Sequence, residues 1–93
     1  MEFWEIYDQY YLKVRKFILA LVKDEWVADD LIQETFLKVQ QNIKTLRDPS
    51  RLSSWIFRIA HNLCQDHFRR LKKSRKEERI DQEETEDLKE ALT

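Results

Sequence analysis

Apolar side chains recur every three or four positions along the first 22 residues, which predicts an amphipathic helix from about residue 2 to residue 22. One stripe of this helix alternates spacings of four and three and should face a core. Its members are Phe3, Tyr7, Tyr10, Val14, Phe17 and Leu21, and Ile6, Tyr11 and Ile18 widen it. The charged tripeptide at 23–25 interrupts the pattern, so we expect the helix to end there.

A second helix is expected from about residue 25 to residue 44, with Asp24 as its N-cap. Acidic side chains crowd its first turns, where they interact favourably with the positive end of the helix dipole. The positions that should face the core repeat at helical spacing and are Val27, Leu31, Thr35 or Phe36, Val39 and Ile43.

Residues 45–50 form the one clear loop, because Pro49 cannot continue a helix and biases Asp48 toward an extended backbone. A third helix should follow from about residue 52 to residue 79. Three serines could cap the start of this helix: Ser50, Ser53 and Ser54. Its buried stripe should be Leu52, Trp55 or Ile56, Ile59, Leu63 and Cys64. Beyond Phe68 the apolar pattern nearly stops.

Glycine is absent and proline occurs once, so hairpins and sheets are disfavoured. A chain of 93 residues suits one domain with a modest core. We therefore expect an all-α fold, a small three-helix bundle over residues 1–79. Residues 80–93 should form a mobile acidic tail or linker, in which Leu88 and Leu92 leave room for a short fourth helix.

The net charge of −1 hides a strong asymmetry along the chain. Residues 1–34 carry four basic and eight acidic side chains, a net charge of −4. Residues 35–79 carry twelve basic and four acidic side chains, a net charge of +8, and residues 80–93 have a net charge of −5. This distribution indicates a basic protein partner for the first block and a polyanion for the middle block.

The single cysteine, Cys64, excludes an intramolecular disulfide, and a reducing cytoplasm is the simplest setting. No apolar run approaches the roughly 18 residues of a membrane span, and the acidic N-terminus has no signal-peptide pattern. We therefore expect a cytoplasmic protein without direct membrane insertion.

Asp30, Gln33 and Glu34 fall at positions i, i+3 and i+4 and should share one face of the second helix. Leu31 and Phe36 should point toward the core. An acidic face with one amide suits Arg and Lys side chains of a partner helix. The alternative is an ordinary solvated helix start with charges that favour the dipole.

The segment from Ser53 to Asn62 combines aromatic rings, Arg58 and hydrogen-bonding groups, which suits single-stranded nucleic acid. Bases stack on rings, cations meet phosphates, and the paired donor and acceptor of Asn62 suit a base edge. The alternative places Trp55 and Phe57 in the core and makes Asn62 a plain surface residue.

Seven cations fall in eleven positions near the end of the third helix: Arg69, Arg70, Lys72, Lys73, Arg75, Lys76 and Arg79. Only two glutamates oppose them, so the run favours phosphate binding that weakens steeply with salt. A solvated helix end is the alternative.

The sequence gives little indication of a metal site or a catalytic site. His61, Cys64 and His67 lie at spacings of three, but a zinc site usually needs a fourth ligand and none is apparent. Without glycine no Gly-rich phosphate loop is available, and Asp66 and His67, as helix neighbours, point in different directions. We expect no cofactor, no metal and no enzyme activity.

In order, the chain contains an aromatic-rich helix, Ala-Asp-Asp-Leu-Ile-Gln-Glu-Thr-Phe at 28–36, a loop, Ser-Trp-Ile-Phe-Arg-Ile-Ala-His-Asn-Leu at 54–63 and a basic helix end. This order resembles region 2 of extracytoplasmic-function sigma factors over about residues 3–76. The resemblance implies a sigma factor domain that binds core RNA polymerase and helps to melt the promoter minus-ten element.

The same resemblance assigns residues to each partner. Asp30, Gln33 and Glu34 match the segment that docks on the clamp helices of the largest polymerase subunit. The loop at 47–54 and the third helix match the elements that bind the non-template strand. The DNA-binding positions implied are Arg47, Ser50, Arg51, Ser54, Trp55, Arg58, Asn62, Arg69, Arg70, Lys72 and Lys73. An anti-sigma factor is a further implied partner.

Three departures from the family pattern matter. The loop carries Leu-Arg-Asp-Pro-Ser at 46–50 where a Phe-Arg-Gly-like stretch is common, and Trp55-Ile56 replaces the Trp pair of primary sigma factors. The family's second DNA-binding domain, which binds the minus-thirty-five element, is missing, so residues 80–93 should begin the linker toward it. Competing hypotheses are a sigma-like interaction module that binds an anti-sigma factor or acts as a decoy without opening promoters, a general nucleic-acid-binding bundle, and a metal-dependent helical enzyme.

Overall fold

The computed structural model describes the backbone of residues 2–92 and the side chains of residues 2–74. Its helices are α1 (Phe3–Val22), α2 (Glu25–Asn42) and α3 (Leu52–Leu92), with two 3-10 turns, η1 (Ile43–Thr45) and η2 (Pro49–Arg51), between α2 and α3. The described part of the chain has no strand, and the predicted all-α three-helix bundle is confirmed.

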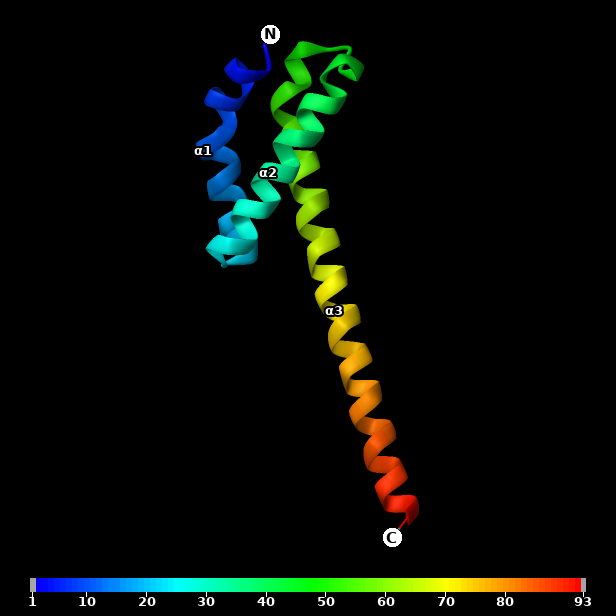
Figure 1. The fold of residues 1–93 in the computed structure, drawn as a ribbon. Helices are drawn as coiled ribbons and strands as arrows, with labels where there is room; N and C mark the ends of the chain where they lie inside the picture. The colour runs from blue at the N-terminus through cyan, green and yellow to red at the C-terminus, as the bar shows by residue number, and fades with distance from the viewer. Residues whose placement is uncertain (1, 93) are drawn as a thin grey trace.

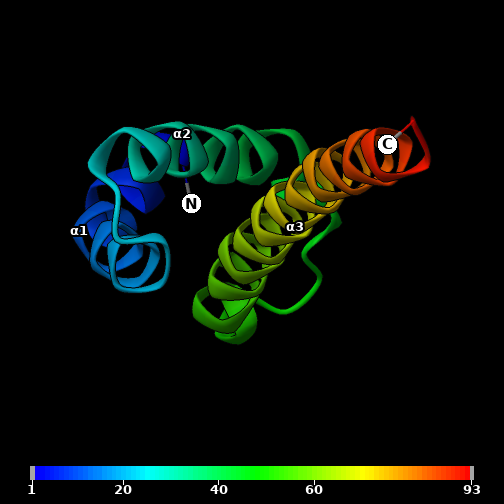
Figure 2. The ribbon, with the colours of Figure 1, turned by 90° about the horizontal axis from the view of Figure 1, so that it is seen from below.

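All three helices contact one another, and α1 and α2 run beside the first half of α3 (Figure 1). Seen from below, the helices surround a common centre and do not form a single layer (Figure 2). The rest of α3 continues past the ends of α1 and α2, and the molecule is 68 Å long and 25 Å wide. No helix of the described chain combines the length and apolar character needed to cross a membrane.

A tight turn reverses the chain between α1 and α2. Lys23 adopts the left-handed conformation (φ 56°, ψ 26°), and its N–H donates to the carbonyl of Leu19. The Asp24 carboxylate then accepts from the backbone N–H groups of Trp26 (2.9 Å) and Val27 (3.3 Å). Asp24 is therefore the N-cap of α2, as predicted.

The connection from α2 to α3 is more ordered than the loop expected from the sequence. Asp48 is extended (φ −117°, ψ 104°), as the following Pro49 predicts, and Pro49 opens η2. The expectation that the serines cap α3 is wrong for Ser50 and Ser54. Asp48 caps η2 by accepting from the Ser50 N–H (3.0 Å) and hydroxyl (2.7 Å), and the Ser54 hydroxyl donates to the Arg51 carbonyl (3.1 Å).

The ends of two helices differ from the prediction. The second helix was expected to reach about residue 44, but α2 ends at Asn42 and tightens into η1, whose Thr45 hydroxyl donates to the Asn42 carbonyl (2.6 Å). The third helix was expected to end near residue 79, but α3 continues to Leu92 as one element. The prediction of a mobile acidic tail at 80–93 concerns side chains outside the described residues.

The buried face of α1 is rotated from the predicted stripe. Ile6 and Ile18, expected only at its margin, are fully buried, whereas Tyr7 and Phe17 are half-buried. Tyr10 of the predicted stripe is buried in the core, whereas Tyr7 packs at the edge of the core against the buried ring of Phe36 (centroids 4.8 Å apart).

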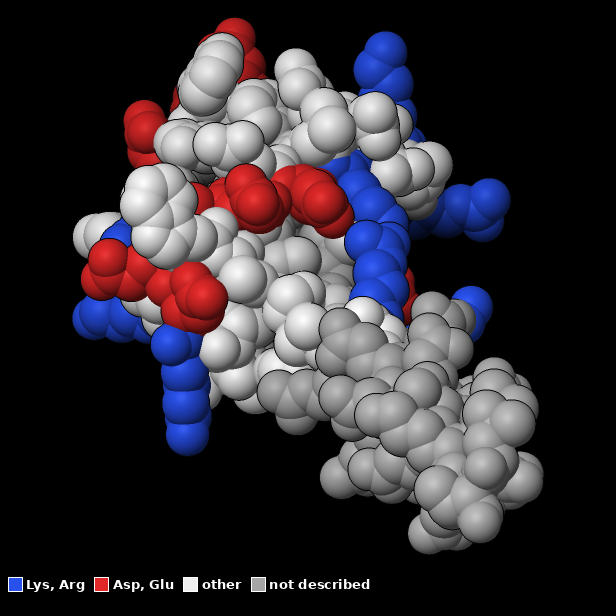
Figure 3. Space-filling model, turned by 60° about the horizontal axis from the view of Figure 1, so that its bottom comes forward, with Lys and Arg blue, Asp and Glu red and all other residues white. Residues whose placement is uncertain are grey.

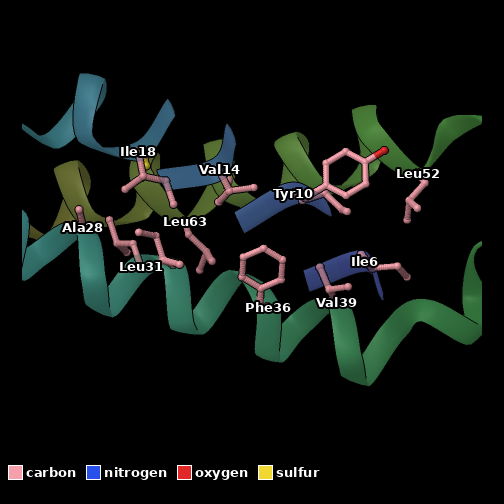
Figure 4. Packing of buried hydrophobic residues seen from close by; sticks show 14 residues of the cluster. Ile6, Tyr10, Val14, Ile18, Ala28, Leu31, Phe36, Val39, Leu52 and Leu63 are labelled. Atoms are coloured by element: carbon pink, nitrogen blue, oxygen red, sulfur yellow. The ribbon is translucent and has the colours of Figure 1, made fainter. Parts of the chain in front are cut away.

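The core between the helices is apolar and continuous. Figure 4 shows Leu31, Phe36 and Val39 pointing from α2 toward the side chains of the other two helices. Thr35 is the one buried polar residue among those described, and its hydroxyl donates to the Leu31 carbonyl (2.7 Å). Of the two alternatives at the start of α3, Ile56 is buried and Trp55 is half-buried. Three further small or branched residues, Ala28, Ile32 and Ala60, lie in the core without having been predicted there.

Candidate protein- and nucleic-acid-binding surfaces

The outer face of α2 carries the predicted protein-binding residues. Asp30, Gln33 and Glu34 are all exposed, while Leu31 and Phe36 are buried, so this helix is oriented as the sequence predicts. The orientation follows from the apolar half of α2, because rotating the helix to bury the carboxylates would expose its core residues.

Asp30 and Glu34 keep their charges available. Within residues 2–74 neither forms an ion pair, whereas the neighbouring Asp29 pairs with Arg15 of α1 (3.1 Å). The Tyr11 hydroxyl and the Asp29 carboxylate raise the pKa of Arg15, so this arginine stays charged and bound to Asp29. Asp30 and Glu34 are thus exposed carboxylates without an ion pair among the described residues.

Where α2 meets α3, the acidic face borders a shallow groove of about 190 Å³. Its floor is apolar, and both helices contribute charged side chains to its rim. The lining is Val27, Asp30, Leu31, Glu34, Leu63, Asp66, His67 and Arg70. Figure 3 shows acidic side chains in a row across this surface, ending against basic side chains beside α3.

Arg70 lies on a different side of α3 from the other predicted DNA-binding cations. It lines the groove together with Asp30 and Glu34, at the edge of the protein-binding face. Arg69, one residue earlier, points about 100° away around the helix and is exposed. The sequence run of cations therefore divides between two surfaces of α3.

One face of α3 gathers most of the remaining predicted residues. Trp55, Arg58, Asn62, Arg69 and Lys72 are spaced by three, four, seven and three, which places them on a single stripe. All are exposed except the half-buried Trp55. This stripe points away from the core-facing positions of α3, so cations, an amide and an aromatic edge meet solvent together. Lys73 is exposed at its border.

The connection before α3 places Arg47, Ser50 and Arg51 on the surface, and it leads directly into the helix that carries the stripe. Its shape is set locally. The Ser50 hydroxyl and N–H lower the pKa of Asp48, and Arg51 Nε lies 3.8 Å from Asp48 Oδ2. Ser50 and Ser54 were predicted to bind DNA through their hydroxyls. Both hydroxyls donate their hydrogen bond within the chain, so they remain available to DNA only as hydrogen-bond acceptors.

An apolar pocket of about 510 Å³ opens at the top of the bundle, beneath this connection. Its lining comes from α1, from the connection between α2 and α3, and from the first residue of α3; it consists of Ile6, Ile43, Lys44, Leu46, Pro49 and Leu52. This pocket was not predicted from the sequence, although Leu46 and Pro49 in an otherwise polar loop could have indicated it.

The candidate metal ligands do not come together. Cys64 is fully buried and burial raises the pKa of its thiol, whereas His61 is exposed and its Nε2 lies 3.4 Å from Gln65 Nε2. Among the described residues no three His, Cys, Asp or Glu side chains are grouped so as to hold a metal ion.

The sequence model of the Sigma-70 region 2 family matches residues 6–74, which include both surfaces. The chain belongs to this family. The sigma region 2 chain is 39% identical to the ECF RNA polymerase sigma factor SigM of Bacillus subtilis over 74% of its own length and 42% of SigM.

Two further relatives agree with this assignment. The RNA polymerase sigma factor SigZ of B. subtilis is 34% identical over 80% of the chain and 42% of SigZ. The ECF RNA polymerase sigma factor BldN of Streptomyces coelicolor is 38% identical over 72% of the chain and 26% of BldN. The resemblance to the extracytoplasmic-function group is confirmed, and the chain spans less than half the length of these relatives. No solved structure matches it significantly.

Proposed function

We propose that this chain joins core RNA polymerase to the promoter minus-ten element during transcription initiation. The observation that carries the proposal is the separation of two exposed surfaces of opposite charge on different helices. The acidic face of α2 presents Asp30 and Glu34, and the stripe of α3 presents Arg58 and Arg69. Such a division lets one small bundle bind a protein and a nucleic acid at the same time.

The acidic face is the proposed polymerase-binding surface. The family resemblance assigns it to the clamp helices of the largest subunit, and an exposed amide between two unpaired carboxylates fits basic side chains of a helix. Leu31 and Phe36 hold this face in place from the core.

The stripe of α3 is the proposed DNA-binding surface. Cations at Arg58, Arg69, Lys72 and Lys73 would bind phosphates, and Asn62 between them would contact a base edge. The exposed edge of Trp55 is available for stacking against a base. Arg47, Ser50, Arg51 and Ser54 would extend this surface into the connection. A phosphate contact by Arg70 stays a prediction, since it lies beside Asp30.

The apolar pocket under η2 is the proposed receptor for an unstacked base. It adjoins the exposed Arg47 and Ser50, and its lining of Leu46, Pro49 and Leu52 excludes water from a ring face. Extruding a base costs a few kcal/mol, and contacts on both sides of the strand would offset that cost.

We further propose that residues 1–79 form the region 2 domain of a cytoplasmic sigma factor and that residues 80–93 lead toward a second DNA-binding domain. An anti-sigma factor would compete for these surfaces. The chain itself would make no covalent bond, so the proposal requires neither a catalytic residue nor a cofactor.

Co-purification with bacterial core polymerase tests the proposal. The wild-type chain should bind core and retain a labelled minus-ten single strand, and Asp30→Arg with Glu34→Lys should abolish core binding without unfolding. Glu5→Lys with Asp8→Arg on α1 makes the same charge change at exposed positions and should bind normally.

The alternative of a sigma-like interaction module predicts a different outcome. Such a module would bind core or an anti-sigma factor through the acidic face but show no preference for minus-ten sequences. Sequencing of the promoter DNA that accompanies the core complex separates the two hypotheses.

A further inference from the structure

The outer face of α1 is turned to solvent. Figures 1 and 2 show α1 at one side of the bundle, and no other segment of the described chain crosses the face that points away from α2 and α3. Leu12 lies on the opposite side of the helix from the buried Tyr10 and Val14, so it marks the middle of this face. Trp4 lies at its edge, and both Leu12 and Trp4 are 66% exposed. The outer face of α1 therefore presents apolar area that the fold of one copy does not bury.

Exposed charges of opposite sign divide this face into two halves. Glu5 and Asp8 precede Leu12, whereas Lys16 follows it and Lys23 ends the helix. Within residues 2–74 none of these four charges forms an ion pair. Asp8 and Lys16 are about 12 Å apart along the helix at 1.5 Å of rise per residue, which is too far for a pair within one copy. The charges are therefore available to a partner whose charges run in the opposite direction.

The other two helices lack this balance of charge. The outer face of α2 also exposes a large apolar side chain, Trp26 (85%), but Lys38 is the one basic residue of that helix. Asp66 is the one acidic residue among the described side chains of α3. A second copy that docked on the same face of either helix would place like charges together, which disfavours self-association. Among the helices of the described chain, α1 is the one whose own face complements itself.

We propose that the outer face of α1 binds the same face of a second copy, with the two helices antiparallel about a twofold axis beside Leu12. Positions equally far from Leu12 on either side then lie opposite each other. Leu12 of one copy contacts Leu12 of the other, and Asp8 of each copy lies opposite Lys16 of the other. Trp4 comes to the level of residues 19–22 of the second copy, where Leu19 and Val22 are half-buried and apolar.

The size of this contact makes the dimer weak. α1 has 20 residues and is about 30 Å long, so a single helix pair buries less than the roughly 1,200 Å² at which stable interfaces begin. We therefore expect a dimer that forms at micromolar concentration and separates at nanomolar concentration. The contact uses neither the acidic face of α2 nor the stripe of α3, so it does not rest on the proposed function.

Sedimentation of the full chain across the micromolar range tests the dimer. The wild type should show a monomer–dimer equilibrium. Asp8→Lys and Lys16→Asp should each raise the dimer Kd at least about tenfold, because each places two like-charged pairs across the twofold axis. Leu12→Glu should do the same by placing two carboxylates on the axis itself. Circular dichroism and the urea midpoint should match wild type for all three, since these positions are exposed.

A mixture of two variants makes the test specific to the antiparallel arrangement. Asp8→Lys and Lys16→Asp fail to dimerise alone, but an equimolar mixture should form a heterodimer about as tight as wild type, because both facing pairs again join opposite charges. A fluorescent label on one variant reports the heterodimer. Glu34→Lys and Lys38→Asp make the same charge changes at exposed positions of α2, and each should dimerise like wild type.

Three results would overturn the inference. The first is a wild-type chain that stays monomeric over the whole micromolar range. The second is a wild-type dimer that Asp8→Lys and Lys16→Asp leave intact, which would place the interface on another face. The third is a mixture of these two variants that stays monomeric, since that would exclude the facing of residue 8 and residue 16. None of these results changes the expected binding of polymerase or DNA, so the proposed function is tested separately.

Discussion

Replacing Arg69, Lys72 and Lys73 by glutamine should flatten the salt dependence of single-strand binding. Four exposed cations lie on or beside the α3 stripe, these three and Arg58, and Arg58 and Lys73 are about 22 Å apart at 1.5 Å of rise per residue. A single strand that follows the stripe can therefore contact all four through its phosphates. Each cation that neutralises a phosphate releases counterions, so the number of contacts sets the slope of log K against log salt.

The expected slopes follow from the number of phosphate contacts. With about 0.7 per phosphate, the four contacts of the α3 stripe contribute about −2.8 to the slope, and the one contact left in the variant contributes about −0.7; phosphate contacts by Arg47 and Arg51 add equally to both. Between about 50 mM and about 200 mM salt, the stripe contacts alone should raise Kd about 50-fold for wild type and about threefold for the variant. Fluorescence anisotropy of a labelled minus-ten oligonucleotide across this range measures both slopes.

A control variant separates position from total charge. Lys13, Lys16 and Lys23 are exposed on α1 and its C-terminal turn, so their replacement by glutamine removes the same charge away from the stripe. Its slope should stay close to that of wild type, because all phosphate contacts are kept. The reasoning is refuted if the α3 variant keeps the wild-type slope, or if both variants flatten it equally.

Three further predictions concern the core, the base contact and the thiol. Ile56→Ala, at a fully buried position between the helices, should lower the free energy of unfolding by about 2–5 kcal/mol in urea titration followed by circular dichroism; a loss well below that range would mean that the site collapses. Asn62→Ala should reduce discrimination among minus-ten sequences by about 1–3 kcal/mol, and equal weakening on every sequence would indicate phosphate contact alone. Burial raises the pKa of the Cys64 thiol above its ordinary value of 9.0. The neutral thiol therefore contributes fully to stability while the pH is below 9.0, and this contribution is lost as the pH rises through the pKa of the folded chain. Ellman's reagent at pH 8 should therefore react slowly with the folded chain and fast in urea; rapid reaction when folded would contradict the burial.

Helical periodicity predicted the fold because it is a local property of the chain. The Asp24 cap and the extended Asp48 before Pro49 follow from side-chain chemistry within a few residues, and both are confirmed. The centre of the α1 face was not predictable in the same way. Whether Ile6 or Tyr7 is innermost depends on how much space α2 and α3 leave, which no spacing along α1 contains.

The candidate surfaces were likewise predictable only where they lie on one helix. The spacing of Asp30, Gln33 and Glu34 predicted a shared exposed face of α2, and all three residues are exposed. The groove that brings Arg70 beside Asp30 joins two helices, and the run of cations gave no sign of it. The exposure of Trp26 was equally hidden, because the sequence alone does not show that α1 and α3 leave that side of α2 uncovered.

The central claim is that one bundle binds a protein through α2 and a strand through α3, independently. The most direct test measures both affinities for two variants, Asp30→Arg with Glu34→Lys, and Arg58→Gln with Arg69→Gln and Lys72→Gln. The first should lose core polymerase and keep the minus-ten oligonucleotide, and the second should keep the polymerase and lose the oligonucleotide. If either variant loses both partners while remaining folded, or neither loses any, the division of surfaces is wrong.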